Sequence, residues 1–273
     1  MSKVLILGKG YIGEQIHEAL GWPSATTMIH QFKDIFEVIE KYRPQTIVNC
    51  IGFTGQRNVD DCELALDETL EANTFVPILL AEAALRNKIK FVHLSSGCIY
   101  HYDYDKQKPI SEEDVPDFYD LYYSRSKIYT DNVLVELAKR YNILILRIRV
   151  PLAPKPHPRN ILNKLLKYKT VIDVPNSVTY IPDFIKNLQH LLKINARGIY
   201  NVVCQGGLRY PDILDEYQKY VPEFQYSTIK LKDLKLVRTN LVLSTAKLEK
   251  TGAKVRTVHE VIKECVKEYV KFS

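Results

Sequence analysis

Three side chains in the first half of the chain have the chemistry to reduce a carbonyl group. Tyr123 and Lys127 are four positions apart, so they lie on one face of the segment if it is helical. A nearby ammonium lowers the pKa of a phenol from its usual value of about 10, and the phenol can then protonate a carbonyl oxygen as a hydride arrives. The hydroxyl of Ser96 can hold the same oxygen. With 18 tyrosines such a pair can arise by chance, so the order of motifs carries the assignment.

A glycine-rich loop precedes this pair near the N-terminus. Gly8, Gly10 and Gly13 have the spacing G-x-G-x-x-G, directly after an apolar run and at the start of a helical pattern. In that context small residues let the backbone approach a pyrophosphate, and the N-terminus of the helix faces its negative charge. The alternative is a glycine turn without chemical meaning. We expect the loop, with Tyr11 and Ile12, to bind a dinucleotide.

The segment after the second expected strand bears on the choice of dinucleotide. An NAD site usually offers an acidic residue there, which binds the ribose 2′-hydroxyl. Residues 25–33 contain no acid, whereas His30 and Lys33 could meet a 2′-phosphate. The sequence therefore favours NADP(H) over NAD(H).

The elements that must position these groups alternate between strands and helices. Apolar runs predict strands at residues 4–7, 45–50, 90–95 and 143–150, and helical patterns cover residues 12–20, 69–87 and 124–141. Strands separated by helices indicate βαβ units and a parallel sheet covered on both faces. We predict an α/β fold, a Rossmann-type doubly wound sheet, over residues 1–150.

The composition changes at Pro151, where four prolines fall within residues 151–158. Residues 151–273 are predicted to form a smaller α+β substrate-binding domain, with some segments returning to the first sheet. The last helix has one apolar face, so Cys265 on it is expected in the core. That face consists of Val258, Val261, Ile262, Cys265, Val266 and Tyr269.

Composition excludes several classes of protein. The 273 residues are 46% apolar, and 38 basic and 32 acidic residues give a net charge of 38 − 32 = +6. Because these charges interleave, they disfavour a nucleic-acid partner but allow an anionic small substrate. Five cysteines without a C-x-x-C pair suggest neither disulfides nor a metal site. Without a signal sequence or a membrane-spanning run, a cytoplasmic location is expected.

Longer stretches carry a resemblance to a known family. The chain resembles the extended short-chain dehydrogenases/reductases, and is similar within them to the bifunctional 3,5-epimerase/4-reductases that complete UDP-L-rhamnose synthesis. The family's usual loop is G-x-x-G-x-x-G; this one is a residue shorter, and we still expect it to bind the pyrophosphate. The matching stretches are residues 49–63, 96–103, 123–127, 147–151, 158–160, 172–177 and 238–240.

The resemblance implies roles for several residues in an NADPH-dependent reduction of UDP-4-keto-6-deoxy-D-glucose at C4. Tyr123 would give the proton, Ser96 would polarise the carbonyl, and Lys127 would hold the ribose and lower the tyrosine pKa. Gly52 is assigned to the cofactor, and Thr54 to the substrate.

The resemblance also implies an acid and base pair for epimerisation at C3 and C5. It places this pair at Cys98 and Lys164, which spacing alone does not identify. A helical wheel puts Lys164 off the apolar face, as for a solvated lysine. His157 is the rival partner for Cys98, because a histidine has that role in the related GDP-fucose synthase. The substrate-binding residues by the same comparison are Arg149, Asn160 and Arg238.

Other interpretations remain open from the sequence. One is a 4-reductase without epimerase activity, of the dTDP-4-dehydrorhamnose reductase type, and another is a non-catalytic NADP-binding regulatory subunit. The nucleotide can be UDP or dTDP. The resemblance further implies a homodimer, and a separate 4,6-dehydratase that supplies the 4-keto sugar.

Overall fold

The computed structural model describes residues 3–234 and 237–272 and contains two compact units. Each unit is assembled from several stretches of the chain, so each is described by itself. Unit 1 comprises Met1–Ile99, Pro116–Arg147 and Leu192–Tyr200, and unit 2 comprises Tyr100–Val115, Ile148–Leu191 and Asn201–Ser273.

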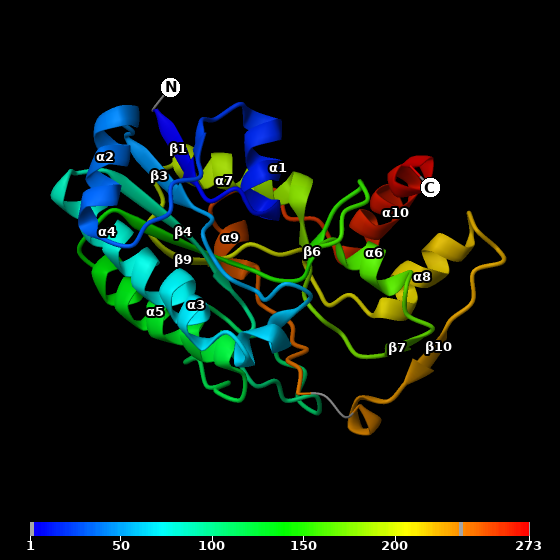
Figure 1. The fold of residues 1–273 in the computed structure, drawn as a ribbon. Helices are drawn as coiled ribbons and strands as arrows, with labels where there is room; N and C mark the ends of the chain where they lie inside the picture. The colour runs from blue at the N-terminus through cyan, green and yellow to red at the C-terminus, as the bar shows by residue number, and fades with distance from the viewer. Residues whose placement is uncertain (1–2, 235–236, 273) are drawn as a thin grey trace. The chain divides into compact units, whose positions relative to one another are not determined.

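A six-stranded sheet forms the centre of unit 1 (Figure 1). Its order is β2-β1-β3-β4-β5-β9, and β1 pairs in parallel with β2 and β3, as β3 does with β4. The chain therefore changes direction across the sheet between β1 and β3, where open parallel sheets bind ligands. The predicted Rossmann-type sheet is confirmed. The strands are β1 Val4–Leu7, β2 Ser24–Ala25, β3 Thr46–Asn49, β4 Lys90–Ser96, β5 Ile143–Ile148 and β9 Gly198–Asn201.

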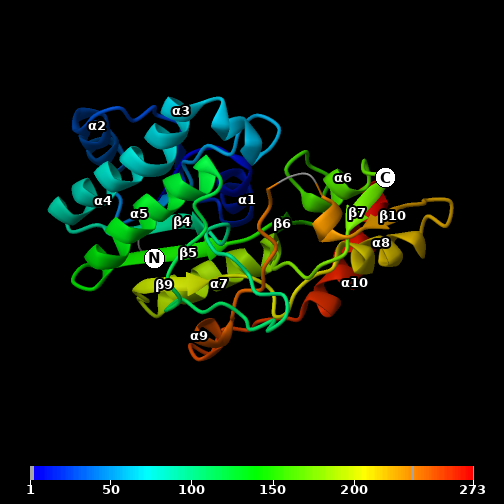
Figure 2. The same cartoon turned by 90° about the horizontal axis from the view of Figure 1, so that it is seen from below.

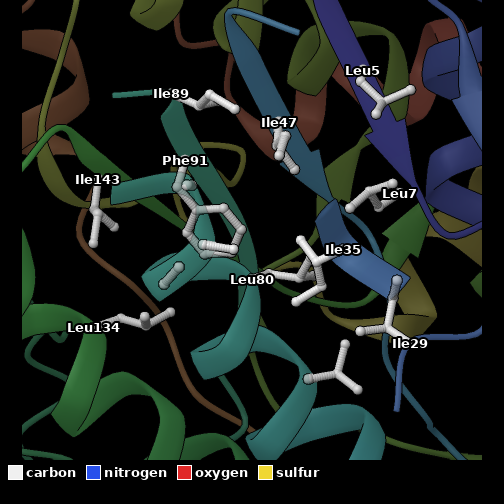
Figure 3. Close-up of a cluster of buried hydrophobic side chains, with 14 of the residues drawn as sticks. Leu5, Leu7, Ile29, Ile35, Ile47, Leu80, Ile89, Phe91, Leu134 and Ile143 are labelled. Atoms are coloured by element: carbon white, nitrogen blue, oxygen red, sulfur yellow. The ribbon is translucent and has the colours of Figure 1, made fainter. Parts of the chain in front are cut away.

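Helices bury one face of this sheet in a continuous hydrophobic cluster (Figure 3). Strand residues such as Leu5, Ile47 and Phe91 meet Ile35 and Leu80 from the helices. Intervening strand residues are buried as well, which explains the uninterrupted apolar runs in the sequence. The helices of this unit are α1 Tyr11–Leu20, α2 Phe32–Tyr42, α3 Leu66–Leu70, α4 Val76–Arg86 and α5 Tyr122–Ala138.

The helix expected over residues 69–87 is interrupted by a π-helical turn, Glu71–Phe75, between α3 and α4. Pro77 has no N–H, so the carbonyl of Asn73 has no helical partner four residues later. The hydroxyl of Thr130 on α5 donates to that carbonyl oxygen at 2.5 Å. The π turn is thus held in place by the neighbouring helix.

Unit 2 combines two small sheets with short helices. Strand β6 (Pro151–Leu152) pairs with β8 (Thr179–Tyr180), and β7 (Thr170–Ile172) pairs with β10 (Ser227–Ile229). Helices α8 and α10 lie side by side (Figure 2), and the predicted apolar face of α10 is buried, Cys265 included. The helices are α6 Ile161–Leu165, α7 Ile181–Lys193, α8 Tyr210–Gln218, α9 Ala246–Glu249 and α10 Val258–Tyr269.

Among the described residues, no helix has both the length and the apolar character that crossing a membrane requires.

Candidate active site

The glycine loop after β1 fits closely against the loop after β3. Gly8 has φ +94°, and a Cβ on it would lie 2.8 Å from the backbone nitrogen of Ile51. A Cβ on Gly13 would overlap the carbonyl oxygen of Gly8. Gly10 precedes α1, and a Cβ there would meet no atom within 4 Å. The loop is therefore closed on its inner side and open at the helix N-terminus, which suits a pyrophosphate.

Tyr11 and Ile12 form the first turn of α1, and both are partly buried. Beyond β2, the ring of His30 lies 2.6 Å from Glu71, and the Lys33 ammonium lies 3.9 Å from Glu37. Both basic side chains are exposed. Their contact with a 2′-phosphate stays a prediction.

The loop after β3 brings Gly52 to Lys127. A Cβ on Gly52 would lie 3.4 Å from the Lys127 Nζ. The side chain of Asn73, in the π turn, accepts a hydrogen bond from the N–H of Phe53 and donates one to its carbonyl oxygen, each at 2.9 Å. This two-point contact fixes the loop, and partly buried Thr54 follows it.

The end of β4 places a hydroxyl and a thiol two residues apart. The Ser96 Oγ accepts a hydrogen bond from the N–H of Cys98 at 3.1 Å, which defines the turn after the strand. Ser96 is buried, whereas Cys98 is half-buried. The hydroxyl can donate a hydrogen bond to a carbonyl oxygen, and the thiol can exchange a proton with a neighbouring C–H group.

Helix α5 supplies Tyr123 and Lys127 from one face, and both are buried. The N–H of Tyr122, at the start of the helix, donates to Glu63 at 2.5 Å. Burial lowers the pKa of Lys127 to about 8, against the opposing effect of Asp131. The amine can therefore change its charge near neutral pH.

Two buried polar residues beneath this site were missed by the sequence interpretation. The Asn49 amide, at the end of β3, donates to the Nδ1 of His93 on β4 at 3.1 Å, and its oxygen accepts from the Ile51 N–H at 3.0 Å. Burial, with a smaller effect from Lys127, lowers the pKa of His93 well below its ordinary value. The imidazole is neutral there. The available signal was a polar residue inside each of two apolar runs.

In unit 2, Lys164 lies on α6 and is half-buried, so it is less exposed than the helical wheel indicates. Burial lowers its pKa, and Arg159 adds to the effect. His157 lies in the loop before α6, and its Nδ1 accepts a hydrogen bond from the Arg159 N–H at 3.0 Å. A base role for either residue stays a prediction.

Asn160 is fully buried at the start of α6. Its amide nitrogen donates to the carbonyls of Ala153 and Lys155, and its oxygen accepts from the N–H groups of Leu162 and Ala153. These bonds join the proline-rich loop to the helix. Contact between Asn160 and substrate stays a prediction.

Arg149 contacts the backbone of Thr239, the residue that follows Arg238. The Arg149 guanidinium is buried and donates to the carbonyl oxygen of Thr239. Arg238 is partly exposed and donates to the carbonyl of Val237 at 2.7 Å. Within unit 2, Arg149 thus holds the backbone of the segment that carries Arg238.

Known proteins with similar sequences act on keto sugars. The chain is 30% identical to a bifunctional dTDP-4-dehydrorhamnose 3,5-epimerase/dTDP-4-dehydrorhamnose reductase of Arabidopsis thaliana, over 94% of this chain and 89% of that protein. It is 29% identical, over 94% of its length, to a trifunctional UDP-glucose 4,6-dehydratase/UDP-4-keto-6-deoxy-D-glucose 3,5-epimerase/UDP-4-keto-L-rhamnose-reductase of the same plant. The chain spans 40% of the length of that relative.

Solved structures share the fold. A UDP-rhamnose synthase from Acanthamoeba polyphaga mimivirus superposes with a TM-score of 0.89 at 26% identity, covering 98% of this chain and 99% of that one. A dTDP-4-dehydrorhamnose reductase from Bacillus anthracis, in complex with NADP, superposes with a TM-score of 0.82 at 17% identity, covering 100% of this chain and 99% of that one. At this identity the likeness shows the fold alone.

The family itself follows from the first three-fifths of the sequence. Residues 4–171 match the family described as NAD dependent epimerase/dehydratase. This stretch contains the glycine loop, Ser96, Tyr123 and Lys127. The resemblance stated from the motifs is thereby confirmed, and the chain belongs to the NAD dependent epimerase/dehydratase family.

Proposed function

We propose that the chain converts UDP-4-keto-6-deoxy-D-glucose to UDP-L-rhamnose by 3,5-epimerisation and reduction of the 4-keto group. The observation that carries the proposal is the arrangement in unit 1. The loop after β3 places Gly52 so close to Lys127 that a Cβ on it would lie 3.4 Å from the amine, and the turn after β4 sets Cys98 next to Ser96. A reductase needs Lys127 and Ser96, whereas the thiol adds a group for proton exchange. The 3,5-epimerase/reductase names of the relatives agree with that pair of activities.

The cofactor is proposed to be NADP(H), held by the loop from Gly8 to Gly13 and by Lys127. Bound there, it supplies the hydride that C4 accepts. The open face at Gly10 and the helix N-terminus provide backbone N–H groups for its pyrophosphate. NADP is the dinucleotide in the structure of the Bacillus anthracis reductase.

In the reduction, the Tyr123 hydroxyl gives its proton to the C4 oxygen while Ser96 donates a hydrogen bond to the same oxygen. The Lys127 ammonium favours the tyrosinate that remains. One proton and one hydride enter the substrate, so the carbonyl becomes an alcohol. Solvent then restores the tyrosine proton.

In the epimerisation, a base removes the proton from C3 or C5, and the electron pair moves to the C4 oxygen as an enolate. An acid then returns a proton to the opposite face of the same carbon. Cys98 and Lys164 are proposed to share these roles, with His157 as the alternative to Lys164. A half-buried amine with a lowered pKa is suited to either role.

The experiment is incubation of the purified chain with UDP-4-keto-6-deoxy-D-glucose and NADPH in D2O, followed by NMR of the product. We expect NADPH consumption, deuterium at C3 and C5, and UDP-L-rhamnose. Reduction without deuterium would identify a 4-reductase alone, and no NADPH consumption would refute the proposal. The dTDP-linked substrate, run in parallel, tests the nucleotide.

Cys98→Ala separates the two activities. We expect it to abolish deuterium uptake at C3 and C5, while NADPH oxidation continues with a substrate that is already epimerised. Cys62→Ala is the matched control, since Cys62 is a buried free thiol in the same unit. Deuterium uptake that persists in Cys98→Ala removes the thiol from the mechanism.

The assembly is proposed to be a homodimer. Helix α5 exposes Tyr129 and Val133, and the π turn beside it exposes Phe75. Light scattering after size exclusion would measure the mass, and a monomer would contradict the proposal.

We also propose that a separate 4,6-dehydratase supplies the 4-keto sugar. Omitting that enzyme from a coupled assay that starts from UDP-glucose should prevent rhamnose formation.

A further inference from the structure

Arg149, a buried arginine directly after β5, has its backbone fixed by two hydrogen bonds to Thr179. The backbone N–H of Arg149 donates to the hydroxyl of Thr179 at 2.9 Å, and the Thr179 N–H donates to the Arg149 carbonyl at 2.6 Å. Val150 follows with φ +32°, a conformation that a β-branched residue rarely adopts. Such strain persists where the surroundings hold it, and it is found at ligand-binding segments.

The Arg149 guanidinium sets the orientation of a neighbouring amide. Its Nε donates to the Oδ1 of Asn176 at 3.0 Å, and the N–H of Leu241 donates to the same oxygen at 3.4 Å. Both groups can only donate, so the oxygen of Asn176 is identified by its chemistry. The Asn176 nitrogen therefore points the other way, and it donates to the Oδ1 of Asn240 at 3.2 Å.

This chain of hydrogen bonds leaves the amide nitrogen of Asn240 as a donor. Asn240 is buried, and no described residue accepts from its nitrogen. A buried donor without an acceptor is costly, and a bound oxygen can remove that cost. The partly exposed Arg238 lies two residues earlier.

The backbone from Thr239 to Leu241 is held by hydrogen bonds from other segments. The Arg149 guanidinium donates to the Thr239 carbonyl, and the Tyr104 hydroxyl donates to the Asn240 carbonyl at 2.6 Å. The Ser177 N–H donates to the carbonyl of Leu241 at 2.7 Å. Three successive peptide groups are fixed, so the segment needs little ordering when it binds a ligand.

We propose that Arg149 is a positioning residue, which through Asn176 and Thr239 holds the Arg238 guanidinium and the Asn240 amide nitrogen toward the diphosphate of the sugar nucleotide. Arg149 acts without touching the substrate. The inference rests on the proposed function only for the kind of ligand, a nucleoside diphosphate.

The test is a double-mutant cycle on the full chain, with UDP binding measured by calorimetry. R149M and R238A should each weaken UDP binding about tenfold. The double variant should bind more weakly than R238A, because the Asn240 donor is also lost, but by clearly less than about a hundredfold, because Arg149 acts in part through Arg238. NADPH binding should stay within about twofold, since its loop lies in unit 1. Losses that multiply to about a hundredfold would mean direct contact by Arg149, and unchanged UDP binding in R149M would also overturn the proposal.

Asn176→Asp provides a second variant if R149M does not fold. It keeps the acceptor for Arg149 but removes the donor that orients Asn240, so UDP binding should weaken as in R149M. Asn240→Asp replaces the unpartnered donor by an acceptor and should weaken it further. Arg209→Met is the control, because Arg209 is a surface arginine of the same unit, paired with Asp173. It should leave UDP binding unchanged.

Steady-state kinetics separate positioning from general damage to the fold. R149M should raise KM for the sugar nucleotide about tenfold with kcat within about threefold, whereas loss of folded enzyme lowers kcat alone. If wild-type enzyme binds UDP but turns nothing over, the proposed function fails while the binding cycle still tests Arg149. Equal KM values for R149M and wild type would contradict the positioning role.

Discussion

Lys127 is a buried amine whose charge is sensitive to pH in the range where an enzyme works. Because burial lowers its pKa to about 8, the ammonium is present below that pH and is lost above it. The neutral amine no longer stabilises a tyrosinate at Tyr123. We therefore expect kcat/KM for the reduction to fall as pH rises through about 8, measured as NADPH oxidation.

Substitutions at Lys127 test this assignment. K127M should lower the reduction rate by about 10²-fold or more and abolish the pH dependence near 8. K127R keeps a charge that is not lost in this range, so any remaining activity should extend to higher pH. A decline near pH 8 that persists in both variants would assign the titration to another group.

His93 links the stability of the protein to acid. Its pKa in the folded protein lies well below the ordinary value of 6.5, so below pH 6.5 the unfolded chain binds a proton that the folded chain does not. The contribution of neutral His93 to the free energy of unfolding is therefore fully present above pH 6.5, and it is lost as the pH falls toward the pKa of His93 in the folded protein. The slope approaches about 1.4 kcal/mol per pH unit.

Urea unfolding between pH 5 and 6.5 would measure this slope. His93→Gln should reduce it by about one proton equivalent, even where the variant is less stable overall. His259→Gln, on an exposed position of α10, is the matched control and should keep the slope. An unchanged slope in His93→Gln would show that the acid sensitivity arises elsewhere.

The sequence predicts residues whose partners are close along the chain, as for Tyr123 and Lys127 on one helix. It does not predict Asn49 with His93, because their contact depends on which residues of β3 and β4 stand side by side. Lys164 shows the same limit. A helical wheel places it outside the apolar face, but its burial is set by packing around a five-residue helix.

At the scale of elements, different glycines of the loop between β1 and α1 serve packing and ligand binding. Gly8 and Gly13 are needed for close packing, whereas a Cβ at Gly10 meets nothing in the protein. Gly10 has φ −75°, which any residue adopts. Gly10→Ala should therefore keep the melting temperature within about 2 °C while its methyl group takes space needed by the pyrophosphate, weakening NADPH binding about tenfold.

Gly13→Ala is the contrasting variant, and it should lower the melting temperature because its Cβ would overlap the Gly8 carbonyl. Fluorescence titration with NADPH and thermal unfolding give the two measurements. If Gly10→Ala binds NADPH as tightly as wild type, the pyrophosphate does not lie over this residue.

The π turn shows why the boundaries of elements are harder to predict than their presence. The helical pattern over residues 69–87 is correct in type, and Pro77 within it is tolerated at the first turn of α4. The pattern cannot show that Thr130, on another helix, donates a hydrogen bond to the Asn73 carbonyl. The side chain of Asn73 then holds Phe53 and the loop that carries Gly52.

For the whole molecule, a net charge of +6 raises the question of whether the overall field or a few placed cations attract anionic ligands. The charges interleave along the sequence, and exposed pairs such as Lys33 with Glu37 cancel locally. Interactions between exposed charges are screened beyond about 8 to 10 Å at physiological salt. A diffuse excess therefore acts weakly, and cations placed close to the ligand should dominate.

Two substitutions that change the net charge equally can decide between these possibilities. R238Q and K263Q each leave 37 − 32 = +5, but Lys263 lies on the exposed side of α10. Because placed cations should dominate, R238Q should raise KM for the sugar nucleotide and flatten its dependence on salt between about 50 and 500 mM, whereas K263Q should match wild type. Equal effects of the two variants on that salt dependence would mean that the overall field guides the substrate.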